Sequence, residues 1–194
     1  MLIVGTDPAA VEAKLYAGGF SCPDCGGSLR PWGRGVEREI RHRNRIERRR
    51  PRRSMCRPCV KTHILLPEDS LARRRDATEV IGAGLVAKAE GSGHRSIASM
   101  LGRHPSTVRG WLRRFAVMAT RVREHFTRWA HVLDPGRIAA EPTGSAFSDA
   151  VDAIGVVTQM AVRRFGPRPA WQQVSVLTGG RLLANTSAPY PRPV

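Results

Sequence analysis

Residues Gly93 to Phe115 read GHRSIASMLGRHPSTVRGWLRRF, and the organisation of the chain follows from them. Their spacing predicts a short helix over residues 96–101, a turn at Gly102 and a second helix that opens at Pro105. Glycine at the turn can adopt the positive φ that a sharp reversal needs. Apolar residues recur at intervals of three and four in both segments, so each helix has one face to bury. The pattern predicts a helix-turn-helix.

The outward positions of the second helix carry chemistry suited to duplex DNA. A helix fits the major groove, where its N-terminal residues reach the edges of the bases. Arginine pairs with guanine through two hydrogen bonds, and Ser or Thr bonds bases or phosphates. We expect Ser106, Arg109 and Arg113 to face the groove. The expected phosphate contacts nearby are Arg103, His104, Thr107 and Arg114. The alternative is an ordinary amphipathic helix pair with a solvated basic face.

The charge of the chain narrows the class of partner. Its 194 residues include 32 Lys and Arg against 16 Asp and Glu, a formal net charge of +16. An excess of positive charge of this size indicates that the binding partner is a polyanion, either nucleic acid or an anionic membrane surface. No apolar run is long enough to span a bilayer, and the first residues lack a basic leader. We therefore expect a cytoplasmic, nucleoid-associated protein with no membrane partner.

Four cysteines occur as two pairs, Cys22-Pro-Asp-Cys25 and Cys56-Arg-Pro-Cys59. In a reducing compartment, two such pairs indicate a tetrahedral zinc site with four thiolate ligands. The alternatives are a pair of disulfides or unrelated surface thiols. His42 or His63 could replace a cysteine as a metal ligand, but four sulfurs already complete the coordination shell. We predict a structural Zn²⁺.

The 30 residues between the two cysteine pairs contain a dense basic run. Segments 29–32, 36–42 and 45–50 read as short strands with a turn at Asn44, and 60–66 reads as a further strand. A basic run is favoured when it lies along phosphates and releases their counterions, so we expect a projecting finger on DNA. A solvated charged loop is the alternative. The expected contacts are Arg45, Arg48, Arg49, Arg50, Arg52 and Arg53.

The remaining segments read mainly as helices. A strand over 2–4 and a helix over 7–16 come first, and Asp76 with Glu79 three residues on predicts a capped helix before the helix-turn-helix. The apolar period continues from Val108 to Leu133, which favours a core stripe over a dimer seam. Further helices are expected over 148–165 and 170–183, with a disordered tail over 187–194.

These observations predict a mainly α protein with a small N-terminal β zinc ribbon and a tri-helical helix-turn-helix core followed by C-terminal helices. We expect a zinc-ribbon-like domain with a basic hairpin over residues 1–67. A helix-turn-helix domain with an extended helix follows over 68–134. A linker, the C-terminal helices and the tail occupy 135–194.

The combination resembles a family of bacterial, commonly actinobacterial, proteins that join a zinc ribbon to a helix-turn-helix and are encoded by or beside insertion elements. The resemblance is carried by CPDCGG, the arginine-rich stretch, CRPC followed by THILLP, LARRR, and IASMLGRHPSTVRGWLRRF, over roughly residues 20–115. The helix-turn-helix also resembles the homeodomain-like domains of resolvases and transposases. The resemblance implies DNA binding, with Cys22, Cys25, Cys56 and Cys59 as metal ligands.

Catalysis is not expected from this chain alone. Transposases that resemble RNase H hold two metal ions with three carboxylates on a mixed α/β domain. The carboxylates after residue 115 lie on helix-like or linker sequence: Glu124, Asp134, Glu141, Asp149 and Asp152. We therefore expect a sequence-specific DNA-binding protein, an accessory or regulator of an insertion element.

Two alternatives stay open, a metal-dependent transposase or nuclease that uses Mg²⁺, and an RNA-binding zinc-ribbon protein. The expected partner is double-stranded DNA. A homodimer and a transposase or recombinase partner are both compatible with the pattern.

Overall fold

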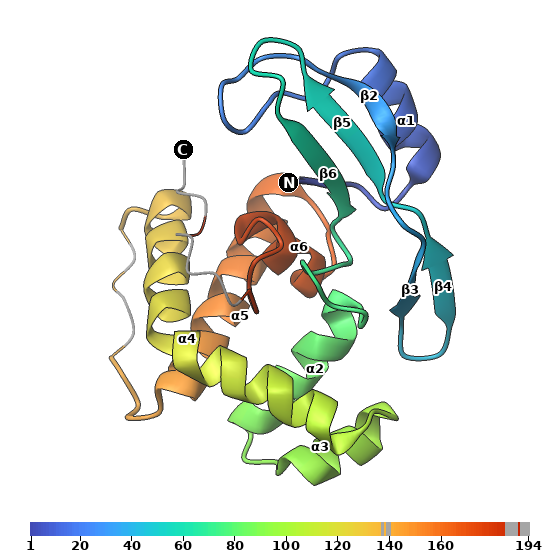
Figure 1. The fold of residues 1–194 in the computed structure, drawn as a ribbon. Coiled ribbons are helices and arrows are strands. Elements are labelled where there is room, and N and C mark those ends of the chain that lie inside the picture. Colours follow the sequence, from blue (N-terminus) through green and yellow to red (C-terminus); the bar gives the residue numbers. More distant parts are fainter. Residues whose placement is uncertain (137, 139–140, 185–189, 191–194) are drawn as a thin grey trace.

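The computed structural model describes residues 1–136, 138, 141–184 and 190, and this part of the chain forms six helices and six strands. Figure 1 shows a sheet at one end of the molecule, a group of helices at the other, and a separate hairpin beside them. Most of the tail predicted to be disordered, and residues 137 and 139–140 of the predicted linker, lie outside the described residues.

Four strands form a mixed sheet in the order β1-β6-β5-β2. They are β1 (Leu2–Val4), β2 (Leu29–Arg34), β5 (Arg52–Cys56) and β6 (Thr62–Pro67). β1 runs parallel to β6, while the β6–β5 and β5–β2 pairs are antiparallel.

Helix α1 (Pro8–Tyr16) packs on this sheet. The Asp7 side chain accepts a hydrogen bond from the Ala9 N–H at 2.9 Å, as expected where proline opens a helix. Val11 and Leu15 of α1 join Leu29 and Leu65 of the sheet in one buried apolar cluster.

A second, two-stranded sheet consists of β3 (Arg38–Arg41) and β4 (Ile46–Arg49). Both strands and their turn lie where the sequence predicts a hairpin. The hairpin is not a projecting finger, however, because Ile40 is only 3% exposed and belongs to the helical core. Burial of this one apolar side chain in the basic run holds the hairpin against the helices.

The helix-turn-helix segment contains α2 (Thr78–Ala89), α3 (His94–Leu101) and α4 (Pro105–Leu133). Gly102 ends α3 with φ 61°, and α4 begins at Pro105, both where expected. The predicted cap at Asp76 is wrong: Ala77 precedes α2 with no side-chain cap, and the Asp76 carboxylate pairs with arginines instead. The apolar stripe of α4 is core, since Phe115, Val122 and Phe126 are fully buried.

Helices α5 (Ala146–Phe165) and α6 (Ala170–Leu177) complete the helical part. α5 packs along α4, where the Phe147 ring meets the Phe115 ring edge-to-face with centroids 4.7 Å apart. α6 is shorter than predicted and packs against α2, α5 and β1. A Cβ atom on Gly82 of α2 would lie 2.0 Å from the Trp171 ring of α6, so glycine is what allows this close approach.

The predicted fold class is wrong. The strands do not form a small ribbon followed by a separate helical core: four of them build a mixed sheet, and the hairpin packs into the core of the helices. β5 was not predicted, because its arginines and the preceding Pro51 obscure the strand pattern. The parallel partner β1 lies about sixty residues from β6 in sequence, beyond the reach of any local pattern.

Candidate metal centre and basic surface

Each pair of cysteines lies on a tight turn at one end of the sheet. The first turn follows α1, and the Cys22 N–H donates to the Gly27 carbonyl oxygen at 2.7 Å. The second turn joins β5 to β6, and the Cys56 N–H donates to the Lys61 carbonyl oxygen at 2.9 Å. Leu29 pairs with Cys56 in the β2–β5 register, which brings the two turns side by side.

The two turns share a backbone feature. The residue after each second cysteine has a positive φ, 74° at Gly26 and 59° at Val60. Glycine adopts this conformation freely, whereas a β-branched residue is strained in it. The Gly26 N–H donates to the Cys22 carbonyl oxygen at 2.9 Å, and the Val60 N–H to that of Cys56 at 3.1 Å. The second turn keeps this geometry despite the strain, as functional sites often do.

The four sulfur atoms lie within 4.8 Å of one another. The Cys25 and Cys56 sulfurs are 3.4 Å apart and those of Cys22 and Cys59 are 3.8 Å apart, so neither pair is a disulfide. Metal–sulfur bonds of about 2.3 Å in tetrahedral geometry place neighbouring sulfurs about 3.8 Å apart. The four cysteines can therefore hold one metal ion.

The surroundings favour the thiolate form of Cys22. Burial of its sulfur raises the pKa, but hydrogen bonds from the Asp24 and Cys25 N–H groups and from neighbouring thiols outweigh burial, and the pKa falls to about 6. The thiolate is the form that binds a metal. A Cβ atom on Gly27 would lie 2.6 Å from Cγ of Pro58 on the other turn, so the turns approach as closely as glycine permits.

The two histidines named as substitute ligands are far from equivalent. His63 of β6 is buried, with its Nε2 atom 3.3 Å from the Cys22 sulfur, and it can form a group of ligands with Cys22 and Asp24. His42 lies at the turn of the β3–β4 hairpin, where its Nδ1 atom is 3.3 Å from a carboxylate oxygen of Glu79. Only His63 therefore borders the metal centre.

The residues predicted to face a DNA groove lie on the exposed side of α4. Ser106, Arg109 and Arg113 are exposed, and neither of the two arginines has an ion-pair partner among the described residues. His104 caps the helix, since its Nδ1 atom accepts a hydrogen bond from the Ser106 N–H at 3.3 Å. Thr107 is half-buried.

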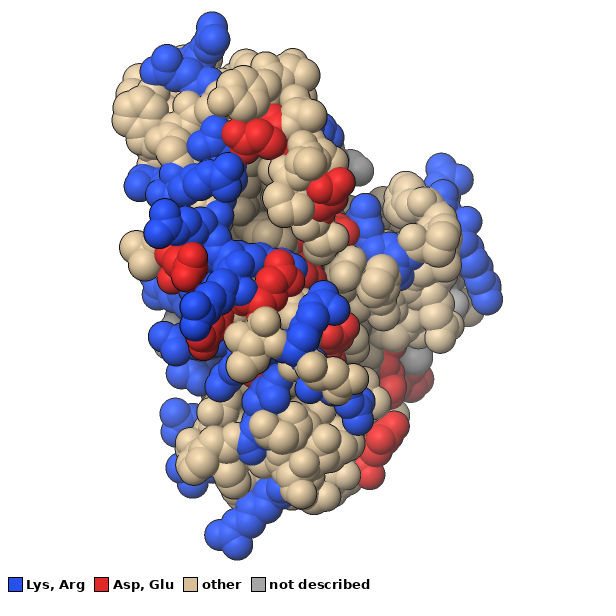
Figure 2. All heavy atoms as spheres, turned by 90° about the vertical axis from the view of Figure 1, so that its right-hand side faces the viewer, with Lys and Arg blue, Asp and Glu red and all other residues tan. Residues whose placement is uncertain are grey.

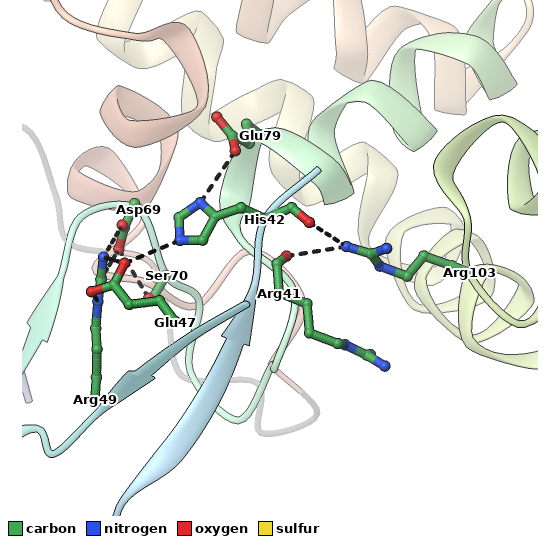
Figure 3. A network of polar contacts seen from close by, with 8 residues as sticks. All are labelled: Arg41, His42, Glu47, Arg49, Asp69, Ser70, Glu79 and Arg103. Carbon is green, nitrogen blue, oxygen red and sulfur yellow. Dashed lines mark hydrogen bonds and ion pairs between the residues drawn. The ribbon is translucent and has the colours of Figure 1, made fainter. Parts of the chain in front are cut away.

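Two of the predicted phosphate contacts beside this face have internal partners. The half-buried Arg114 donates to the Gly110 carbonyl oxygen at 3.1 Å. The Arg103 side chain is 11% exposed, pairs with Asp76 at 2.6 Å and donates to the His42 carbonyl oxygen at 2.7 Å. Figure 3 shows Arg103 reaching the backbone of the hairpin. Arg103 therefore joins the helix-turn-helix to the hairpin instead of extending into solvent.

The six arginines of the basic run that are predicted to contact phosphates divide into two groups, and two of them, Arg52 and Arg53, lie on β5 and not on the hairpin. Arg49 is 16% exposed and held by Glu47 and Asp69, as Figure 3 shows, and Arg52 is 14% exposed and paired with Glu12 at 2.8 Å. The remaining members extend outward or are half-buried: Arg45, Arg48, Arg50 and Arg53. The nearest carboxylates to Arg48 and Arg50 are 3.8 and 3.7 Å away on exposed side chains, where ion pairs are weak.

Lys and Arg side chains gather in a band at the level of the hairpin, and further ones are scattered toward both ends of the molecule (Figure 2). The internal ion pairs made by Asp69 and Asp76 do not follow from the sequence pattern. Asp76 is 3% exposed and lies between Arg41 and Arg103, which are separated from it by 35 and 27 residues. The only signal in the sequence was an isolated carboxylate directly after three arginines, which does not identify its partners.

No described helix has the length and apolar character needed to cross a membrane. In comparisons with known proteins, no family model matches the chain, and no curated protein or solved structure matches it either. The cysteine centre and the exposed arginines are therefore the features that bear on its function.

Proposed function

We propose that this chain binds double-stranded DNA through the exposed face of α4, with the hairpin arginines on neighbouring phosphates. The observation that carries the proposal is the exposure of Arg109 and Arg113 in the first half of α4, directly after the turn at Gly102, while Val108 and Leu112 are buried. A helix presented in this way places arginine where base edges are read. The charge of +16 adds the attraction to phosphates.

The docking of the hairpin gives the proposed interface a defined geometry. Arg103 links the turn before α4 to the end of the hairpin, so the hairpin arginines are held at a set position relative to α4. In the proposed interface Arg109 and Arg113 read bases. The phosphate contacts come from Arg45, Arg48 and Arg50. Arg49, Arg52 and Arg103 are left out because their guanidinium groups hold the fold together.

The DNA proposal is tested by selecting bound sites from random duplex DNA and then measuring variants on the selected site. Arg109→Ala is expected to lose affinity for that site by about 1–3 kcal/mol and to relax the sequence preference. Arg48→Ala is expected to weaken binding to all duplexes alike and to reduce the salt slope by about one phosphate. Arg163→Ala, an exposed arginine near the end of α5, is the control.

Failure to bind any duplex at low salt would refute the proposal. Equal losses for Arg109→Ala and Arg163→Ala would refute the assignment of base reading to α4. Tighter binding to structured RNA than to duplex DNA at matched salt would select the RNA-binding alternative. The proposed role as an accessory or regulator of an insertion element rests on the resemblance of the sequence, and the selected site would show whether it lies at element ends.

We propose further that the metal is Zn²⁺ and that its role is structural. Four thiolates without an open position are typical of structural zinc sites. Removing the metal is expected to disorder the sheet end and leave most helical circular dichroism intact, because the helical core consists of separate residues. Elemental analysis of the purified chain and of Cys56→Ser measures the metal content of both. An unchanged metal content in the variant would refute the assignment of the site to the four cysteines.

A further inference from the structure

Trp32 is placed in an unusual way on the edge strand β2. The β2–β5 pairing changes register between Pro31 and Gly33, so Trp32 is the extra residue of a β-bulge. Bulges re-aim side chains and occur frequently beside functional sites. Trp32 is 51% exposed, although tryptophan is the costliest apolar side chain to leave in water.

The side of the sheet around Trp32 is basic. Leu29 points into the cluster with α1, so alternation directs Arg30 to the opposite side. The Arg30 guanidinium lies 5.9 Å from the Trp32 ring centroid, which places the ring beside Arg30. Arg53 extends from the same side of β5, because Arg30 pairs with Met55, two residues further along that strand. Neither Arg30 nor Arg53 has a carboxylate partner in the described ranges.

We infer that Trp32 is a stacking platform for an unpaired DNA base, with Arg30 and Arg53 on the adjoining phosphates. An exposed aromatic ring among cations matches the way in which proteins hold single strands: the ring takes the face of a base and the cations follow the backbone. This inference rests on the proposed DNA-binding function and extends it. The chain binds a duplex at α4 and a single-stranded segment at the open side of the sheet.

The charge pattern argues against an apolar protein partner at this position. A protein interface would gain from a contiguous apolar surface, whereas the Trp32 ring lies beside Arg30 and Arg53 extends from the same side of the sheet. The apolar Met55, which pairs with Arg30 on this side, is only 6% exposed. Trp32 is also the most exposed of the four tryptophans, since Trp111 is buried and Trp129 and Trp171 are half-buried. Its fluorescence can therefore report a base that stacks on it.

The test is binding of the full, metal-loaded chain to twelve-nucleotide oligothymidine, followed by fluorescence anisotropy and by tryptophan quenching. Trp32→Ala is expected to lower the affinity for oligothymidine by about 5- to 150-fold, the range reported for one stacked base. Trp32→Phe is expected to retain most of the affinity, because an aromatic face remains. The quenching of the wild-type chain is expected to disappear in Trp32→Phe.

Val36→Ala, at another exposed apolar residue of the same part of the chain, is the matched control and should leave oligothymidine binding unchanged. Duplex binding is measured in parallel, and Trp32→Ala should not alter it. Wild-type affinity of Trp32→Ala for oligothymidine, or no binding of oligothymidine by the wild-type chain, would overturn the inference. Failure of the α4 proposal would give a different result. The wild-type chain would not bind duplex DNA, or Arg109→Ala and Arg163→Ala would have the same affinity for the duplex.

Discussion

At the scale of single residues, the metal centre depends on two adjacent glycines with different functions. Gly26 supplies a positive φ, and Gly27 supplies space, because the Pro58 ring of the second turn occupies the position of its missing Cβ. The sequence identifies both as turn residues, but only the distance to Pro58 separates their roles.

Replacing Gly27 with alanine is expected to weaken metal binding by about 10- to 100-fold, as is found for residues that support metal ligands. A Cβ atom 2.6 Å from Pro58 must push the two cysteine turns apart. Competition with a chromophoric chelator measures the affinity. Gly5→Ala is the control, because a Cβ atom at Gly5 meets nothing within 4 Å, and equal affinities for the two variants would contradict this explanation.

At the scale of elements, close packing and internal ion pairs determine how helices, hairpin and sheet meet. Most helix positions could be predicted because apolar periodicity is a local property of the chain. The cap predicted at Asp76 could not, because arginines distant in sequence bind its carboxylate. The pairing of β1 with β6, the strand β5 and the docking of the hairpin could not, since they depend on partners far away in sequence.

The α2–α6 contact predicts opposite effects for two helical glycines. Gly82→Ala should destabilise the fold by about 1–3 kcal/mol, because the new methyl group overlaps the Trp171 ring. Gly155→Ala in α5 should stabilise it by about 0.5–1 kcal/mol, since nothing lies within 4 Å and alanine favours helix. Urea unfolding measures both, and destabilisation of equal size would refute the role of Trp171.

Arg103 and Arg109 look alike in the sequence, but only Arg103 links the hairpin to the helix-turn-helix. The two arginines are therefore expected to differ in their contribution to stability. Arg103→Ala should lower the free energy of unfolding by about 3 kcal/mol, because it removes one partner of a buried carboxylate. Arg109→Ala should change it by less than about 0.5 kcal/mol, as is usual at exposed positions. Thermal or urea unfolding of both variants checks the distinction, and a similar loss for both would contradict it.

At the scale of the whole molecule, a buried histidine links stability to pH. His125 of α4 donates from Nε2 to the Leu177 carbonyl oxygen of α6 at 2.9 Å. Burial lowers the pKa of His125 below its ordinary value of 6.5. The positive charge of Arg128 lowers the pKa as well, and the hydrogen bond to Leu177 raises it by less than burial lowers it. The unfolded chain therefore binds a proton more readily than the folded one, and stability falls as the pH drops below about 6.5.

We expect the wild-type melting temperature to decrease between pH 8 and pH 5 more steeply than that of His125→Gln, whose amide can still donate to Leu177. Scanning calorimetry across this range measures the difference between the two slopes. The difference isolates this group from the other histidines, which both proteins share. Parallel slopes would show that His125 does not contribute.

What the sequence by itself determined is local: the two cysteine turns, the helix-turn-helix boundaries and the exposed face of α4, each set by residues within a few positions of one another. The tertiary structure alone decided which arginines are available to a polyanion. Three arginines cannot be distinguished from their neighbours in the sequence, yet folding brings each of them a carboxylate from 20 to 40 residues away. The pairs are Arg49 with Asp69, Arg52 with Glu12 and Arg103 with Asp76. A guanidinium group that is partly removed from water requires such a partner, and only the folded chain supplies it.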